Sequence, residues 1–225
     1  AKLSTGAASY DIVVPSDYMI ARLIAEGLVR RLNFDNIPNI ENIDLSAVFK
    51  GSAPYYDPES AYSVPYTYGT VGIIYNTAMV DEADIGSWDL MWNPKYKGNI
   101  LQFNNSRDAF ATAQFKLGYS VNSANEAEWR AALAELKAQK DIVQGYVMDE
   151  IFNKMESGSA AISSYYAGDF LTMYADNDDL AFFYPKEGTN VFVDAMCIPT
   201  SSQNPEIAER YINFMLSREA AIANA

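Results

Sequence analysis

The sequence contains no histidine among its 225 residues. Histidine is the commonest general base, the usual zinc ligand and the middle member of Ser-His-Asp and Cys-His catalytic sites. Its absence disfavours hydrolytic and zinc-dependent chemistry. The single cysteine, Cys197, excludes a disulfide within the chain, and its apolar neighbours predict that it packs as a small hydrophobic side chain.

Clustered basic residues and long apolar runs are also missing. The 16 Lys and Arg residues are outnumbered by 29 Asp and Glu residues, which gives a formal net charge of -13. Because phosphate binding relies on clustered basic side chains, this balance argues against a nucleic-acid partner and weakly favours a cationic ligand. No apolar run approaches the ~18 residues of a membrane-spanning helix, and no signal-peptide pattern opens the chain. A leader or lipid anchor is therefore expected only outside this chain.

A buried-strand pattern changes to an amphipathic helix near the start of the chain. The apolar run at residues 12–14 stops at Pro15, after which Ser16 can cap a helix and Asp17 can stabilise its dipole. Apolar residues then repeat at helical spacing, at Ile20, Leu23, Ile24 and Leu28. Such a corner brings polar side chains to the carboxyl end of a sheet, where open α/β folds bind ligands.

The same succession of strand, polar corner and helix recurs along the chain. Loops with short irregular elements are predicted for residues 33–62. The predicted strands are residues 62–69, 70–76, 99–103, 160–166, 181–184 and 191–199. Between and after them, helices are predicted in SWDLMW before the turn at Asn93-Pro94, in NNSRDAFATAQFKLG, after Ser123 with Trp129, Leu133 and Leu136 on one face, at residues 149–158 and 167–174, and from Pro205 onward. This alternation predicts an α/β fold with mostly parallel sheets.

Two helix starts carry specific capping signals. Ser123 and Glu126 form a capping box in the sequence. Asn204 and Pro205 mark the start of the last long helix. Its predicted inward face holds Ile207, Ala208, Tyr211, Phe214 and Met215. Residues 1–8 have the pattern of a helix tail, and the chain ends inside another helical pattern, so we expect a fragment of a longer protein.

Five blocks of sequence occur in a familiar order and spacing: YDIVVPSDYM, YSVPYTYGTVGIIYN, SWDLMWNPKYKGNI, SRDAF and PKEGTNVFVDAMCIP. Together they resemble the spermidine/putrescine-binding proteins of bacterial ABC importers, across nearly all 225 residues. The resemblance implies the two-lobed, type II periplasmic-binding-protein fold. Relative to that family, the first strand-helix unit and the C-terminal segment are missing.

The resemblance also implies a mechanism. One lobe would comprise residues 1–70 and 192–225, the other residues 71–191, with hinge strands in GTVGIIYN and VFVDAM. A polyamine, putrescine or spermidine, would bind in the cleft between the lobes, and the closed protein would deliver it to a membrane permease. The implied protein is an extracytoplasmic monomer that binds its ligand without a cofactor, a metal or catalysis.

A linear polyamine is a string of ammonium groups separated by methylenes, so its site needs spaced carboxylates and aromatic walls. Asp194 is the only charged residue in the apolar strand VFVDAMC, where a bound ammonium would satisfy it. Phe192 points to the same face of that strand and matches an aromatic wall of the family. The alternatives are a structural ion pair for Asp194 and an ordinary core position for Phe192.

Five further residues match ligand positions of the family. Tyr166 matches a second aromatic wall, and Tyr18 with Ser16 matches the corner of the first lobe. Asp108 and Asn105 match positions of the second lobe that meet the far end of the polyamine. Asn105 is neutral where some relatives carry Asp, which favours a shorter or differently placed ligand. The tyrosines can instead be packing residues, and Asp108 can instead serve a helix dipole.

The sequence leaves three other functions open. Adjacent Tyr165 and Tyr166 resemble the paired phenolates of ferric-ion binders of the same fold, although neighbouring strand residues point to opposite faces. A carboxylate enzyme, such as a glycosidase using Asp108 and Asp194, lacks a shared motif. The third alternative is a scaffold domain that binds no ligand.

Overall fold

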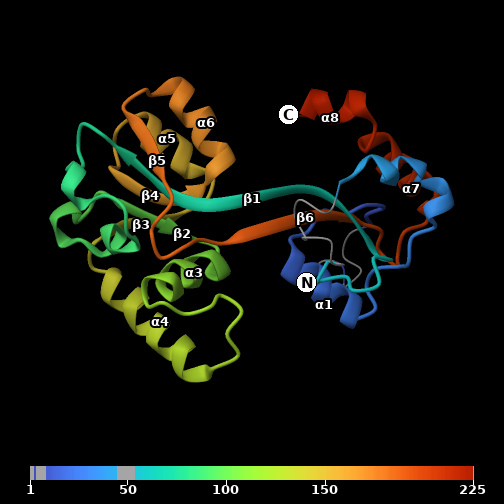
Figure 1. Cartoon of the computed structure of the whole chain (residues 1–225), viewed down its shortest axis with the longest axis horizontal. Helices are drawn as coiled ribbons and strands as arrows, with labels where there is room; N and C mark the ends of the chain where they lie inside the picture. The colour runs from blue at the N-terminus through green and yellow to red at the C-terminus, as the bar shows by residue number, and fades with distance from the viewer. Residues whose placement is uncertain (1–2, 4–8, 45–53, 225) are drawn as a thin grey trace. The chain divides into compact units, whose positions relative to one another are not determined.

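The structure, a computed structural model, describes residues 3, 9–44 and 54–224 (Figure 1). The chain divides into two compact units, one of Ala1–Tyr68 with Phe192–Ala225 and the other of Gly69–Val191. It passes from one unit to the other twice, within strands β1 (Ser63–Asn76) and β6 (Val191–Cys197). Whether the units act as separate lobes stays a prediction. Of the predicted helix tail at residues 1–8, all residues but Leu3 lie outside the described residues.

The first unit is largely helical and irregular. Its helices are α1 (Asp17–Ala25), η1 (Phe34–Asn36), η2 (Pro38–Asn42), α7 (Pro205–Met215) and α8 (Arg218–Asn224). Helix α1 begins after Ser16 as predicted, but the Ser16 side chain makes no capping hydrogen bond. The predicted strand at residues 12–14 is only an isolated antiparallel bridge between Val13 and Cys197. Pro15, which has no N–H to donate, interrupts the ladder there.

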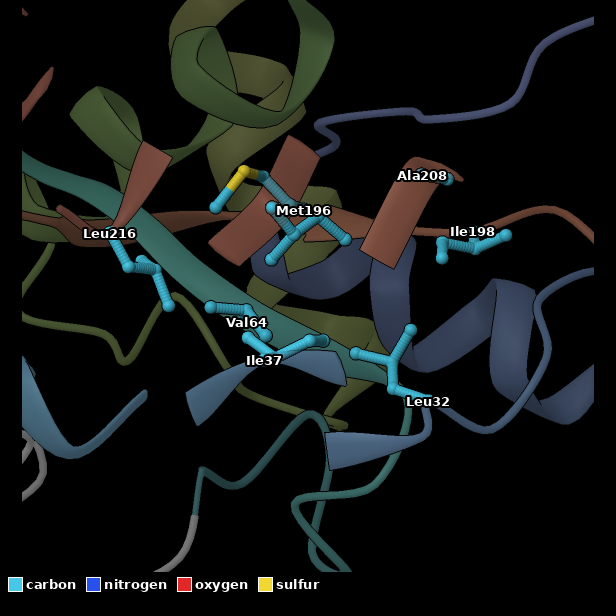
Figure 2. Close-up of a cluster of buried hydrophobic side chains, with 8 residues drawn as sticks. Leu32, Ile37, Val64, Met196, Ile198, Ala208 and Leu216 are labelled. Carbon is cyan, nitrogen blue, oxygen red and sulfur yellow. The ribbon is translucent and has the colours of Figure 1, made fainter. Parts of the chain in front are cut away.

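Two apolar cores lie on either side of β6. Val193, Ala195 and Cys197 pack with residues of α1, while the alternate residue Met196 packs in a cluster with Ile212 of α7. Figure 2 shows the α7 cluster, which also contains Leu32, Ile37, Val64, Ile198, Ala208 and Leu216. The alternation follows from the two-residue period of a strand. Cys197 is buried, as predicted, and burial raises the pKa of its thiol to about 12.

Helix α7 turns only part of its predicted inward face toward the core. Ala208 is buried and Met215 packs against the cluster, as predicted, and Ile212 is buried as well, whereas Ile207, Tyr211 and Phe214 are at least half exposed. The buried Glu209 carboxylate accepts hydrogen bonds from the Asn33 N–H at 2.8 Å and the Asn36 side-chain amide at 2.6 Å. Because a buried carboxylate needs such donors, these hydrogen bonds determine which face of α7 points toward the core.

The second unit is an α/β layer built on one sheet. Its strands, in spatial order, are β3 (Val143–Val147), β2 (Ile100–Phe103), β4 (Ile162–Tyr166), β1 and β5 (Leu180–Phe183), and β6 also pairs with β1. Helices α3 (Ser106–Lys116) and α4 (Glu126–Gln139) cover one face; α5 (Glu150–Glu156) and α6 (Ala167–Asp176) cover the other (Figure 1). Short turns η3 (Glu82–Asp84), η4 (Trp88–Trp92) and η5 (Pro94–Tyr96) precede β2. The predicted α/β class is confirmed.

The sheet is mixed rather than mostly parallel. Strand β2 pairs in parallel with β3 and β4, but β1 is antiparallel to both β4 and β5. Strands β4 and β5 therefore run in the same direction, with α6 as their crossover and β1 inserted between them. The two strands predicted at residues 62–69 and 70–76 are one continuous strand.

Helix α4 begins without the predicted capping box. Its cap is Asn125, whose side-chain oxygen accepts the N–H of Ala127 at 3.0 Å. The Ser123 hydroxyl instead accepts the N–H of Asn125 at 3.1 Å. The asparagine lies closer to the first free N–H groups and therefore takes the role given to Ser123.

Among the described residues, no helix is long and apolar enough to cross a membrane.

Candidate functional site

The first unit brings the strand-to-helix corner against β6. Ser16 and Asp194 form an antiparallel bridge, and the N–H of Ala195 donates to the Pro15 carbonyl at 3.2 Å. Tyr18, 38% exposed, lies two residues after Ser16. Phe192 lies two residues before Asp194 on β6 and is partly buried. Four of the predicted ligand residues thus belong to one region of this unit.

Asp194 is the residue of that region that has a side-chain oxygen with unsatisfied hydrogen-bonding capacity. Its Oδ1 atom is buried and has no hydrogen-bond partner in the described part of the chain. Asp194 is also in none of the ion pairs found among the described residues, so nothing there supports the alternative of a structural ion pair. A carboxylate oxygen removed from water needs a donor. An ammonium group would supply one.

The second unit holds the other three predicted residues where parallel strands end. Asp108, in the first turn of α3 after β2, is buried and accepts the Tyr166 hydroxyl at 2.8 Å. Tyr166 is the last residue of the neighbouring strand β4. Asn105 caps α3, with its side-chain oxygen accepting the Arg107 N–H at 3.0 Å. The structure therefore pairs Asp108 with Tyr166 and gives the Asn105 oxygen a capping role.

Aromatic rings surround this second group. The ring of Phe103 lies 5.3 Å from that of Tyr166, and the rings of Tyr165 and Tyr166 lie 4.8 Å apart. Tyr165 is only 2% exposed, and burial together with nearby carboxylates raises the pKa of its hydroxyl to about 12. A raised pKa disfavours the phenolate that an iron ligand requires. The Tyr166 hydroxyl is engaged with Asp108, so the tyrosine pair is poorly arranged for iron.

Sequence reasoning missed one carboxylate of this region. Asp169 lies in the first turn of α6, three residues after Tyr166, and is partly buried. Burial, followed by the nearby charge of Asp149, raises the pKa of Asp169. Asp149 follows β3, which is parallel to β2 and β4. For Asp169 the sequence signal was available, because it follows the predicted strand at residues 160–166, and the carboxyl ends of parallel strands gather at one sheet edge. The strand before Asp149 was not predicted.

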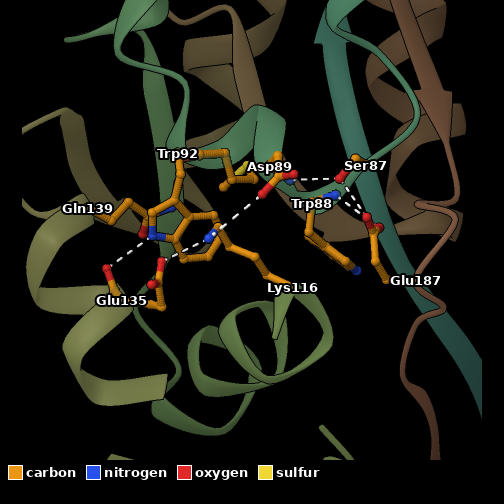
Figure 3. A network of polar contacts seen from close by, with 9 residues as sticks. Ser87, Trp88, Asp89, Trp92, Lys116, Glu135, Gln139 and Glu187 are labelled. Atoms are coloured by element: carbon orange, nitrogen blue, oxygen red, sulfur yellow. Dashed lines mark hydrogen bonds and ion pairs between the residues drawn. The ribbon is translucent and has the colours of Figure 1, made fainter. Parts of the chain in front are cut away.

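A small hollow adjoins Asp108 in the second unit. Its other lining residues are Val71, Trp88, Ala111, Thr112, Phe115, Thr189 and Asn190. Figure 3 shows how Trp88 is held: its backbone N–H donates to Glu187 at 3.2 Å, and the Glu187 carboxylate also accepts the Ser87 hydroxyl at 2.6 Å. The indole N–H of Trp88 donates to the Gly188 carbonyl at 2.9 Å. These bonds fix the segment that leads into β6.

The two groups of predicted residues lie in different units, so a common ligand for them stays a prediction. Ser16, Tyr18, Phe192 and Asp194 belong to the first unit, and Asn105, Asp108 and Tyr166 to the second. Each group contains a carboxylate and at least one aromatic residue. Each is therefore suited to one cationic group of a ligand.

Comparison with known proteins gives consistent matches over the whole chain. The family model described as bacterial extracellular solute-binding protein matches residues 1–225. The spermidine/putrescine-binding periplasmic protein of Escherichia coli is 32% identical over 213 residues, which are 95% of this chain and 60% of that protein. The chain thus spans about 60% of the length of the first curated relatives it matches.

Solved structures give the same picture. The spermidine/putrescine ABC transporter substrate-binding protein of Streptococcus pneumoniae is 34% identical, with a TM-score of 0.79, over 99% of this chain and 67% of that one. A lipoprotein of Treponema pallidum is 28% identical, with a TM-score of 0.88, over 99% of this chain and 70% of that one. These likenesses confirm the predicted periplasmic-binding-protein fold class.

Proposed function

This chain belongs to the family of bacterial extracellular solute-binding proteins, and from that premise we propose that it binds a linear polyamine, putrescine or spermidine. The relatives from Escherichia coli and Streptococcus pneumoniae carry spermidine and putrescine in their names, and their matches cover nearly all of this chain. The family description is that of a binding protein rather than an enzyme. We further propose that the bound polyamine passes to an ABC permease, outside the cytoplasm, without chemical change.

The observation that carries the proposal is the buried Oδ1 atom of Asp194, which has no hydrogen-bond partner among the residues that the structure describes. A primary ammonium brings three N–H donors and a positive charge to such an oxygen. Phe192, on the same strand, supplies an aromatic face for the methylenes that follow the ammonium. In the second unit, Asp108 with Tyr166, and Asp169 close by in sequence, offer the matching contacts for another amine.

The expected affinity follows from ordinary magnitudes. Each of two charge-assisted contacts contributes roughly 1.5–3 kcal/mol. One or two cation–π contacts contribute ~1–2 kcal/mol each, and each of about four buried methylenes contributes ~0.8 kcal/mol. The loss of free motion on association costs at least ~4 kcal/mol. The net is compatible with about micromolar binding, near -8 kcal/mol, which is weak enough for release to a permease.

Calorimetric titration of the chain with spermidine and with putrescine tests the proposal, with magnesium chloride as the charge control. We expect saturable binding of a polyamine and none of magnesium. Asp194→Asn should weaken polyamine binding about 10- to 150-fold, because it removes one charge-assisted contact. Asp35→Asn, at an exposed aspartate of the same unit, should change the affinity less than about twofold.

Two results would contradict the proposal. One is the absence of binding heat with either polyamine while circular dichroism shows a folded chain. The other is an equal loss of affinity in Asp194→Asn and Asp35→Asn, which would reduce the binding to general charge attraction.

A further inference from the structure

Tyr55 is an exposed tyrosine whose hydroxyl and ring each contact a buried residue. Its side chain is 63% exposed, yet its hydroxyl donates to Oδ2 of Asp17, a residue only 4% exposed. Its ring packs edge-on against Tyr56, with ring centroids 5.4 Å apart and an interplanar angle of 86°. Tyr56 is itself 2% exposed. A surface aromatic ring with two such restraints presents its face in a fixed orientation.

Asp17 connects this ring to the proposed ligand residues of the first unit. Its Oδ1 accepts the N–H of Tyr18 at 2.5 Å, and its Oδ2 accepts the N–H of Val193 at 3.4 Å. Val193 is the residue between Phe192 and Asp194, and Ser16, next to Asp17, bridges Asp194. The Asp17 carboxylate therefore binds the Tyr55 hydroxyl and also the backbone N–H groups of Tyr18 and Val193, which belong to or adjoin the proposed ligand residues.

We infer that Tyr55 is a further ligand-contacting aromatic residue of the first unit and that Asp17 is the residue that positions it. The inference rests on the proposed polyamine function. A ring face beside carboxylates attracts an ammonium group or the methylenes next to it. Because the ring is already fixed, binding loses little side-chain entropy there. Asp17 has its oxygens occupied by three donors, so it acts through Tyr55 rather than on the ligand.

Substitutions at Tyr55 separate its ring from its hydroxyl. In calorimetric titrations with spermidine, Tyr55→Ala should weaken binding about 5- to 30-fold, since it removes a cation–π face. Tyr55→Phe keeps the ring but loses the anchor, and should weaken binding about two- to fivefold. Tyr211→Ala, at a half-exposed tyrosine on α7 of the same unit, is the matched control and should leave the affinity unchanged.

A double-substitution cycle tests the positioning role of Asp17. Asp17→Asn should weaken binding in the parent chain and have no further effect in the Tyr55→Ala background, because it acts through that ring. Additive losses would overturn the positioning role. If Tyr55→Ala does not fold, Tyr55→Trp gives a second readout. Its added indole emission should change on spermidine titration, with the midpoint found by calorimetry.

Failure of this inference differs from failure of the proposed function. If the parent chain binds spermidine and Asp194→Asn weakens it, but Tyr55→Ala binds within about twofold of the parent, Tyr55 is only an anchor of its own segment and the inference is wrong. An unchanged Tyr55→Trp emission in a binding-competent variant leads to the same conclusion. A parent chain that binds no polyamine overturns both.

Discussion

Asp57 and Asp194 of the first unit show how a single residue type takes opposite roles. Asp57, 1% exposed, accepts the N–H groups of Ala61, Tyr62 and Ser63 and the Ser63 hydroxyl, at 2.8–3.2 Å. Asp194 instead keeps a buried oxygen to which no described residue donates a hydrogen bond. A saturated carboxylate stabilises the fold, whereas an unsatisfied one is available to a ligand.

The four hydrogen bonds of Asp57 predict a large loss of stability on its removal. Asp57→Ala should lower the free energy of unfolding by about 3–5 kcal/mol, because it leaves several buried donors unpaired. Urea denaturation followed by circular dichroism measures this change. Asp35→Ala, at an exposed position, should change the free energy by less than about 0.5 kcal/mol. A loss below about 1 kcal/mol for Asp57→Ala would contradict the structural role.

At the scale of elements, strand β1 depends on a glycine. Gly72 pairs with Tyr165 of β4, one residue before the positions of β1 that pair with β5, and the ring of Phe182 lies over it. A Cβ atom at this position would lie 2.2 Å from the Phe182 ring and 2.8 Å from the backbone oxygen of Phe183. The ring could rotate away, but the backbone oxygen is held in the sheet. The close approach of β5 therefore requires glycine at this point.

Gly72→Ala should accordingly destabilise the chain by about 1–3 kcal/mol or more through overpacking. The matched substitution is Gly145→Ala in β3, where a Cβ atom would meet nothing within 4 Å. That variant should be neutral or slightly stabilising, since alanine loses less backbone entropy than glycine in a strand. Thermal and urea unfolding of the two variants provide the comparison. Equal stabilities would show that β5 can move away from β1.

At the scale of the whole molecule, the main feature is charge. The net charge of -13 should attract a polycation over distances longer than any direct contact. The negatively charged side chains also repel one another within the folded chain, which lowers the stability of the compact state. Salt screens both effects, so ionic strength should act on ligand binding and on folding in opposite directions.

Raising sodium chloride from about 0.05 M to about 0.5 M should weaken polyamine binding, because the Debye length shortens several-fold. Spermidine, with three ammonium groups, should lose more affinity than putrescine, with two. Over the same range, the free energy of unfolding should stay constant or rise as self-repulsion is screened. Calorimetry and urea denaturation at matched salt concentrations measure the two trends. Equal salt dependence for the two polyamines would contradict long-range attraction.

Local signals in the sequence determined most of the elements. Pro205 and Asn204 placed the start of α7, the pattern after Pro15 placed α1, and the alternation of strands and helices gave the α/β class. These features depend on the backbone restriction of proline and on periodicity, which act over a few residues. The apolar context of Asp194 likewise singled it out as a ligand candidate from sequence.

The tertiary structure alone decided what depends on residues far apart in the chain. The contact between Asp17 and Val193 joins positions separated by 176 residues, and the antiparallel insertion of β1 requires β4 and β5 to be in place. The inward face of α7 was set by Glu209 and its distant partners Asn33 and Asn36. No local pattern encodes such pairings, because a buried carboxylate takes whichever donors the completed fold brings to it.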